Sequence, residues 1–157
     1  MQRVTKILAA GTWPAAAAKA AVTLAHVDRH RRRIALTAED GRQFLLDEQV
    51  ATTLVEGDGL LLDDGAIVAV RAADEDVCDV SCDSPRSLAR LAWHLGNRHL
   101  AVELRDDGLR IRDDHVIVEM LHGLGAQIVR RRAPFNPESG AYHDHGQRHG
   151  HDDDHHH

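Results

Sequence analysis

Short apolar runs separated by turn residues occupy the first half of the chain. The dipeptide Asp40-Gly41 separates the apolar segments 33–38 and 43–46, a spacing typical of a β-hairpin. Two further runs, 60–62 and 67–70, each follow a dipeptide of the same Asp-Gly type. The pattern predicts an all-β region built as a small sheet or sandwich.

The hydrophobic period changes in the second half. Alternating apolar positions over 76–82 predict a strand, and Asp83 or Ser84 can cap a following helix. Pro85 fits the first turn of that helix. Apolar residues then recur at helical spacing: Leu88, Leu91, Ala92 and Leu95. The pair Gly96-Asn97 is predicted to end the helix.

A hairpin and a second helix follow. The turn 106–108 (Asp-Asp-Gly) joins the predicted strands 100–104 and 109–112. Asp114 can cap a helix that closes at Gly125, and a last strand is predicted over 127–130. The resulting order, β-α-β-β-α-β, is the ferredoxin-like arrangement.

The predicted fold class is therefore α+β. We expect an N-terminal β domain over residues 1–74, a ferredoxin-like domain over 75–142 and a His-rich tail over 143–157. The charged stretch 73–76 is interpreted as the boundary between the two domains. The tail has little apolar surface to bury, so it is expected to be disordered without a ligand.

Composition and charge narrow the function classes. Aromatic residues make up 3 % of the chain and the formal net charge is −6, so no nucleic-acid partner is expected. No apolar stretch approaches the ~20 residues of a membrane span, and the N-terminal residues make a poor signal peptide. We therefore expect a cytoplasmic protein. The basic run 29–33 is interpreted as a solvated strand end or a patch for an acidic protein partner, and His26 and His30 as surface residues.

Cys78 and Cys82 share one face of the predicted strand 76–82. At ~3.3 Å per residue they lie ~13 Å apart, which is too far for a disulfide or a shared zinc ion. Both are interpreted as small core residues.

Histidine is the unusual component, with 13 residues in the chain. Seven of these lie in the tail: His143, His145, His149, His151, His155, His156 and His157. Imidazole and carboxylate groups without thiolates suit Ni²⁺, Zn²⁺, Cu²⁺ or Co²⁺. The last three histidines are also compatible with a purification tag, whereas the interleaved remainder is not.

Two histidine segments precede the tail. In the first, His94 lies on the predicted helix and His99 lies just past its end. In the second, His115 is the first residue of the next helix, beside Asp113 and Asp114. These carboxylates could add oxygen ligands, although Asp114 is needed as a cap. No nucleophile with its base and no zinc-protease or phosphate-loop motif is present, so we do not expect an enzyme.

Four features occur in an order that resembles the UreE family of urease accessory proteins, which are nickel metallochaperones. They are His94-Leu-Gly-Asn-Arg-His99, the segment 109–116 (Leu-Arg-Ile-Arg-Asp-Asp-His-Val), the segment 133–142 (Ala-Pro-Phe-Asn-Pro-Glu-Ser-Gly-Ala-Tyr) and a His-rich end. The resemblance implies a β domain related to peptide-binding domains of chaperones, followed by a ferredoxin-like domain that binds metal and forms a homodimer.

The resemblance also implies roles for individual residues. His99 matches the central nickel ligand, and two copies of it would meet at the dimer interface. His115 is similar to a peripheral ligand in members that carry a further histidine two residues earlier, where this chain has Asp113. The tail histidines would add ligands, and Zn²⁺, Cu²⁺ or Co²⁺ would compete with nickel. The implied partners are the urease accessory GTPase and apo-urease; the alternative is a protein whose tail stores or buffers nickel or zinc.

Overall fold

The computed structural model describes residues 1–138, which form two compact units. The first unit contains Met1–Glu75 and also Ala133–Phe135. The second contains Asp76–Arg132 and the chain from Asn136 onward.

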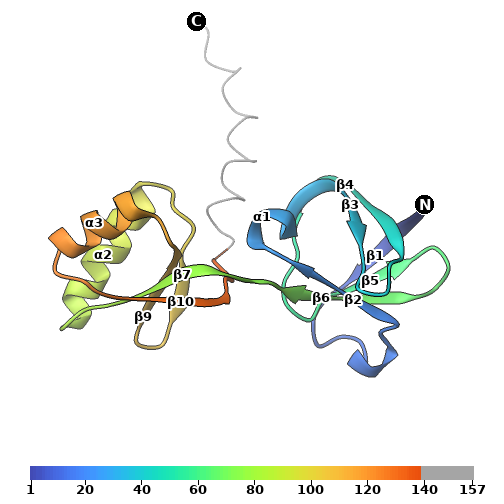
Figure 1. Ribbon diagram of the computed structural model, residues 1–157, viewed down its shortest axis with the longest axis horizontal. Helices are drawn as coiled ribbons and strands as arrows, with labels where there is room; N and C mark the ends of the chain where they lie inside the picture. Colours follow the sequence, from blue (N-terminus) through green and yellow to red (C-terminus); the bar gives the residue numbers. More distant parts are fainter. Residues whose placement is uncertain (139–157) are drawn as a thin grey trace, which may run out of the picture. The chain divides into compact units, whose positions relative to one another are not determined.

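A six-stranded sheet forms the first unit, with the strand order β2-β6-β5-β1-β4-β3 (Figure 1). Its strands are β1 (Gln2–Leu8), β2 (Ala20–Leu24), β3 (His30–Thr37), β4 (Gln43–Thr53), β5 (Gly59–Leu62) and β6 (Ile67–Ala72). A 3₁₀ turn, η1 (Ala15–Ala17), and a four-residue helix, α1 (His26–Arg29), lie on the connections. The predicted hairpin is confirmed, because Thr37 pairs with Gln43 across the Asp40-Gly41 turn.

The core of the first unit is aliphatic with one aromatic residue from the sheet. Along β4, Phe44 and Leu46 are completely buried, and Leu60 and Val68 meet them from β5 and β6. Gly59 is required by packing, because a Cβ atom there would lie 2.7 Å from the Trp13 ring. The Trp13 indole N–H donates to the Gly57 carbonyl at 3.1 Å, which holds the ring over this turn.

The interpretation of the basic run as solvated is wrong for its first residue, and His26 and His30 are not surface residues. Arg29 is 1 % exposed; its Nε donates to the Leu24 carbonyl at 3.1 Å and its Nη2 to the Phe135 carbonyl. His26 is 3 % exposed and meets Phe135 edge to face, with ring centroids 5.6 Å apart. His30 is half-buried, with Nδ1 2.6 Å from Thr53 Oγ1. The Arg29 guanidinium thus supplies donors to carbonyl groups that are buried in this unit.

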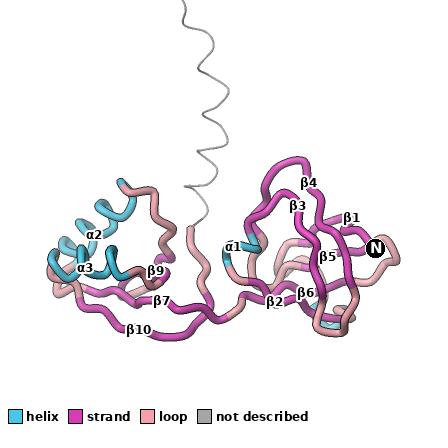
Figure 2. Tube along the Cα trace, turned by 45° about the horizontal axis from the view of Figure 1, so that its top comes forward, coloured by secondary structure: helices cyan, strands magenta, loops and turns pink. Residues whose placement is uncertain are grey.

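The second unit has the predicted ferredoxin-like order. Its elements are β7 (Asp74–Ser81), α2 (Pro85–Asn97), β8 (Glu103–Arg105), β9 (Gly108–Arg112), α3 (His115–Gly123) and β10 (Gln127–Pro134). The strand order is β10-β7-β9-β8, with β7 antiparallel to β9 and β8 antiparallel to β9. Figure 2 shows both helices on one side of these strands.

The two helices and the sheet enclose one core. Cys78 and Val80 of β7 pack with Leu91 and Leu95 of α2 and with Leu121 of α3. Both cysteines are free: Cys78 is completely buried, and Cys82 is half-buried just beyond the end of β7. Their interpretation as core residues agrees with this packing.

Some boundaries of the second unit differ from those predicted, and one agrees. The strand expected over 100–104 begins only at Glu103, because Leu100 still closes the turn at the end of α2. The end of α2 is as predicted, because Asn97, the second residue of the pair Gly96-Asn97, is its last helical residue. The last strand continues to Pro134, where the chain passes to the first unit. Within residues 1–138, no helix is long and apolar enough to cross a membrane.

Candidate metal site

Helix α2 carries the first histidine segment and begins as predicted. Ser84 is the N-cap, and its Oγ accepts a hydrogen bond from the Ser87 N–H at 3.1 Å. Pro85 occupies the first turn, where its missing N–H costs no hydrogen bond. On this helix, His94 is half-buried, and its ring lies 5.0 Å from the ring of Trp93.

The helix ends in a turn that fixes the backbone of His99. The His99 N–H donates to the Gly96 carbonyl at 3.1 Å, and the Leu100 N–H donates to the Leu95 carbonyl at 3.2 Å. This pair of bonds defines a Schellman motif, with His99 as the residue after the C-cap. His99 has φ 55°, the one positive value of a non-glycine residue among the described residues. Its side chain is exposed, while Leu100 is half-buried against the core that contains Leu95.

Helix α3 begins beside the second histidine segment. Asp114 is the predicted cap: its Oδ1 accepts hydrogen bonds from the N–H groups of Val116 at 2.9 Å and Ile117 at 3.2 Å. Asp114 Oδ1 is therefore already engaged in hydrogen bonds that cap the helix. His115 is the first helical residue, as predicted, and is exposed.

Asp113 is engaged by neighbours on the adjacent strands. Its Oδ2 lies 3.2 Å from Arg130 Nε, and its N–H donates to the Asp76 carbonyl at 3.0 Å. Burial, and after it the nearby Asp113 carboxylate, together raise the pKa of the Cys78 thiol to about 11. A metal ion at Asp113 would have to displace the Arg130 guanidinium.

The described residues do not assemble a complete metal site. His99 follows α2 and His115 begins α3, and no group of three or more His, Cys, Asp or Glu side chains converges within residues 1–138. The seven predicted tail ligands lie outside the described residues: His143, His145, His149, His151, His155, His156 and His157.

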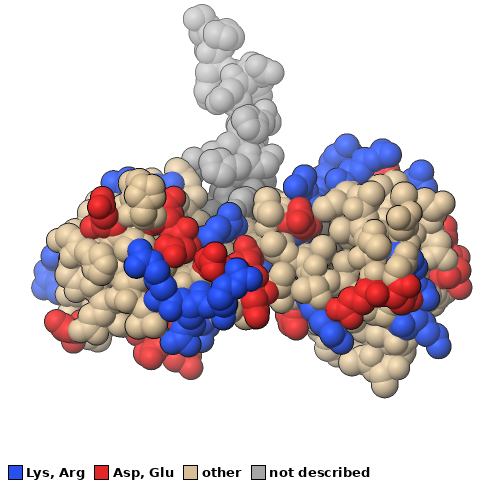
Figure 3. Space-filling model, viewed as in Figure 1, with Lys and Arg blue, Asp and Glu red and all other residues tan. Residues whose placement is uncertain are grey.

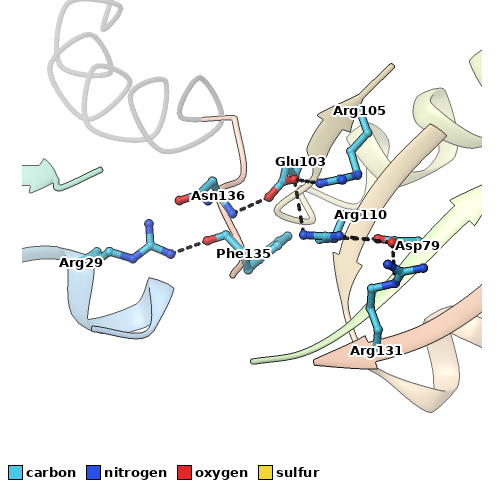
Figure 4. Close-up of polar contacts among 8 residues, drawn as sticks. All are labelled: Arg29, Asp79, Glu103, Arg105, Arg110, Arg131, Phe135 and Asn136. Carbon is cyan, nitrogen blue, oxygen red and sulfur yellow. Dashed lines mark hydrogen bonds and ion pairs between the residues drawn. The ribbon is translucent and has the colours of Figure 1, made fainter. Parts of the chain in front are cut away.

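A charged network, which sequence reasoning missed, lies on the strands of the second unit (Figure 4). The guanidinium of Arg110, 6 % exposed as a residue, donates to both Asp79 oxygens at 2.7 and 3.2 Å. Arg131 adds a contact of 2.9 Å to Asp79. The hydrogen bond from Arg110 holds the pKa of Asp79 below its usual value, and the charges of Arg110 and Arg131 lower it further against the effect of burial.

The same network holds the segment that leads into the tail. Glu103 Oε2 lies 2.7 Å from Arg105 and 3.9 Å from Arg110, and its Oε1 accepts from the Asn136 N–H at 2.7 Å. The Glu138 N–H donates to the Val102 carbonyl at 2.9 Å. The last described residue is therefore bound to a residue only three positions after His99.

The arginines of β10 are neutralised locally. Arg130, Arg131 and Arg132 contact Asp113, Asp79 and Asp76, at 3.2, 2.9 and 3.2 Å. Figure 3 shows basic and acidic side chains side by side on this unit. Residues 130–132 therefore form ion pairs within the unit and do not make a uniformly positive surface.

Comparison with known proteins covers both units. Residues 4–73 match the family model "UreE urease accessory protein, N-terminal domain", and residues 75–157 match the corresponding C-terminal domain. A urease accessory protein UreE of a Bradyrhizobium species is 49 % identical over 150 residues, covering 96 % of this chain and 71 % of the relative. The UreE of Rhodobacter capsulatus is 45 % identical over 158 residues, covering 96 % of this chain and 97 % of the relative. The chain therefore belongs to the UreE family of urease accessory proteins.

Proposed function

We propose that this protein is a nickel metallochaperone, which captures Ni²⁺ and donates it to apo-urease during maturation of that enzyme. The observation that carries the proposal is the exposed imidazole of His99 on a turn whose backbone is fixed by two hydrogen bonds. Imidazole is a good ligand for Ni²⁺, and a carrier needs a ligand that a partner can reach. The protein then acts as a carrier and not as an enzyme.

We propose that a homodimer supplies two copies of His99 to one ion. A single imidazole binds metal weakly, whereas a two-fold axis through the site doubles the number of ligands without any further residue type. Trp93 on α2 is 63 % exposed and Val116 on α3 is 57 % exposed. These side chains give the second unit apolar surface that a second copy could cover.

Tail histidines complete the coordination in this proposal. The hydrogen bond between Glu138 and Val102 supports it, because it binds a residue five positions before His143 to a residue three positions after His99. Tail ligands can be replaced one at a time by ligands of the acceptor, so the ion is transferred without becoming free. His115 is a peripheral ligand, and Asp113 joins it only if the ion displaces Arg130. Zn²⁺, Cu²⁺ and Co²⁺ would compete at the same donors.

The proposed partners follow from the family to which the chain belongs. The acceptors are the urease accessory GTPase and the apo-urease maturation complex, in the cytoplasm. Nickel release to this complex should require contact with the carrier, because exchange of ligands needs both donor sets at the ion.

The test is calorimetric titration of Ni²⁺ into three proteins: the full chain, the chain cut after Tyr142, and the His99→Ala variant. We expect one tight ion per dimer that survives the cut with reduced affinity and is lost in His99→Ala. Binding at pH 5 should be weaker than at pH 8, because a protonated imidazole cannot ligate.

The second candidate is storage or buffering of nickel or zinc by the tail. The seven histidines among the last fifteen residues favour it. In that case the cut after Tyr142 would abolish all tight binding, and His99→Ala would bind as the full chain does. This result would reject the carrier site at His99.

A further inference from the structure

The two helices of the second unit end in the same turn, but with different residues at its critical position. At the end of α3, the Gly125 N–H donates to the His122 carbonyl at 3.0 Å, and the Ala126 N–H donates to the Leu121 carbonyl at 3.0 Å. His99 and Leu100 make the equivalent pair of bonds at the end of α2. Gly125 has φ 87° and His99 has φ 55°.

Glycine is the usual residue at this position for a steric reason. In the left-handed region the Cβ atom of an L-residue crowds the following carbonyl oxygen, whereas glycine has no Cβ atom. The α3 turn therefore uses the residue that the conformation favours. The α2 turn holds a histidine in the same conformation, although Gly96 lies only three residues earlier, within the helix.

Packing holds the α2 turn in place. Leu100 packs against the core that contains Leu95, and Ala126, which is 8 % exposed, packs in the same core after the α3 turn. This contact between the residue after the turn and the last helical turn is typical of the motif. The tertiary structure thus imposes on His99 a conformation that its side chain disfavours.

We propose that the turn from Leu95 to Leu100 is a positioning device, which gives up fold stability to hold the His99 imidazole on a fixed backbone. Leu100 is then a positioning residue: it contacts no metal and acts by locking the turn. The proposal rests on the proposed function for its account of why a histidine stands there. The stability cost itself does not depend on metal binding.

The stability part is tested by melting the metal-free full chain. His99→Gly should melt about 2–4 °C above both the unchanged protein and His99→Ala, because only glycine relieves the conformation. The mirror substitution Gly125→Ala should melt lower by a similar amount. If His99→Gly is no more stable than His99→Ala, the turn carries no strain and the proposal is wrong.

The positioning part is tested by nickel titration of Leu100→Ala. A less rigid turn must be ordered when metal binds, so we expect an affinity lower by about 3- to 10-fold with unchanged stoichiometry. Leu104→Ala is the matched control, because Leu104 is 60 % exposed on β8. Leu100→Met should restore affinity, and Leu100→Val serves if the alanine variant does not fold.

The outcomes separate this proposal from the proposed function. A Leu100 variant with lower melting temperature but unchanged nickel affinity would show a purely structural role and overturn the positioning part. Retention of tight nickel binding by His99→Ala would overturn the proposed carrier site, and with it the positioning part. The predicted rise in melting temperature for His99→Gly would still stand or fall on its own measurement.

Discussion

Histidine lies in opposite environments in the two units. In the first unit His26 and Arg29 are 3 % and 1 % exposed, and they meet Phe135 by ring contact and hydrogen bond. In the second unit His99 and His115 are exposed at the ends of helices. The first pair is buried with Phe135, whereas the second pair lies on the surface of its unit.

The difference follows from how the backbone N–H and C=O groups of each unit find hydrogen-bond partners. A sheet with irregular connections leaves buried carbonyls, such as that of Leu24, which need a long donor side chain. A helix satisfies its ends locally: Asp114 caps the start of α3, and a Schellman turn closes each helix. Asp114 and backbone hydrogen bonds therefore set these helix ends, beside the proposed ligands His99 and His115.

Removing the buried cation should have the largest effect. Arg29→Met leaves two buried carbonyls without this donor, so we expect a loss of about 3 kcal/mol in the free energy of unfolding. Arg31→Met is the control; the Arg31 side chain is 47 % exposed, and the change should cost about 0.5 kcal/mol or less. Urea titration measures both. Equal losses would mean that the basic run is not divided into core and surface residues.

The charged network of the second unit should respond less strongly, and in a pH-dependent way. Asp79→Asn should cost about 2 kcal/mol at pH 7, since it leaves the buried Arg110 without its main counter-charge. The pKa of Asp79 is lowered in the fold, so its carboxylate stabilises the protein above the unfolded pKa of ~3.9. This contribution is lost as the pH falls through the folded pKa.

The difference between the unchanged protein and Asp79→Asn should therefore shrink between pH 5 and pH 2. Urea titrations at several pH values measure it. Asp76→Asn is the control, because the Asp76 side chain is 73 % exposed. A difference that stays constant over this range would show that the Asp79 carboxylate is not linked to acid unfolding.

Loss of the α3 cap should have a smaller effect. Asp114→Ala should lower the free energy of unfolding by about 1 kcal/mol, because the N–H groups of Val116 and Ile117 lose their acceptor. Asp114→Asn keeps an acceptor and should be nearly neutral. If both variants lose nickel while the fold persists, Asp114 is a ligand as well as a cap.

The smallest perturbation is alkylation of the thiols of the folded protein at pH 8. Cys78 is completely buried, and its thiol pKa is raised to about 11, so it should react far more slowly than the half-buried Cys82. Mass spectrometry of digested protein measures the two rates, and unfolding in urea should equalise them. Fast modification of Cys78 in the folded state would show that the second core opens readily.

Local signals predicted most of the second unit. The caps Ser84 and Asp114, the first helical residue His115 and the closing glycine Gly125 follow from residue type and spacing, because each acts within a few residues. The end of α2 at Asn97 was also predicted, but the turn that follows it was not predictable in the same way. It depends on packing of Leu100 against the core that contains Leu95, and it places His99 at a positive φ.

Contacts between segments that are distant in the chain could not be predicted from local sequence patterns. The burial of Arg29 depends on Phe135, which lies 106 residues away in sequence. The ion pairs of Asp79 and Glu103 come from four strands whose neighbours are set by the sheet order. For the metal site, the sequence supplied His99 and His115 as candidates, whereas the left-handed backbone of His99 could be found only in the structure.

The placement of Phe135 has a consequence for how the protein is made. Phe135 is completely buried in a unit that otherwise ends at Glu75. Synthesis of the roughly 57 intervening residues takes about 3 to 11 s at 5–20 residues per second. The N-terminal unit therefore emerges from the ribosome first but is completed late, after the whole sheet and both helices of the second unit have been synthesised. Folding of the nascent chain should show this delay as a protease-sensitive interval that closes once Phe135 has emerged.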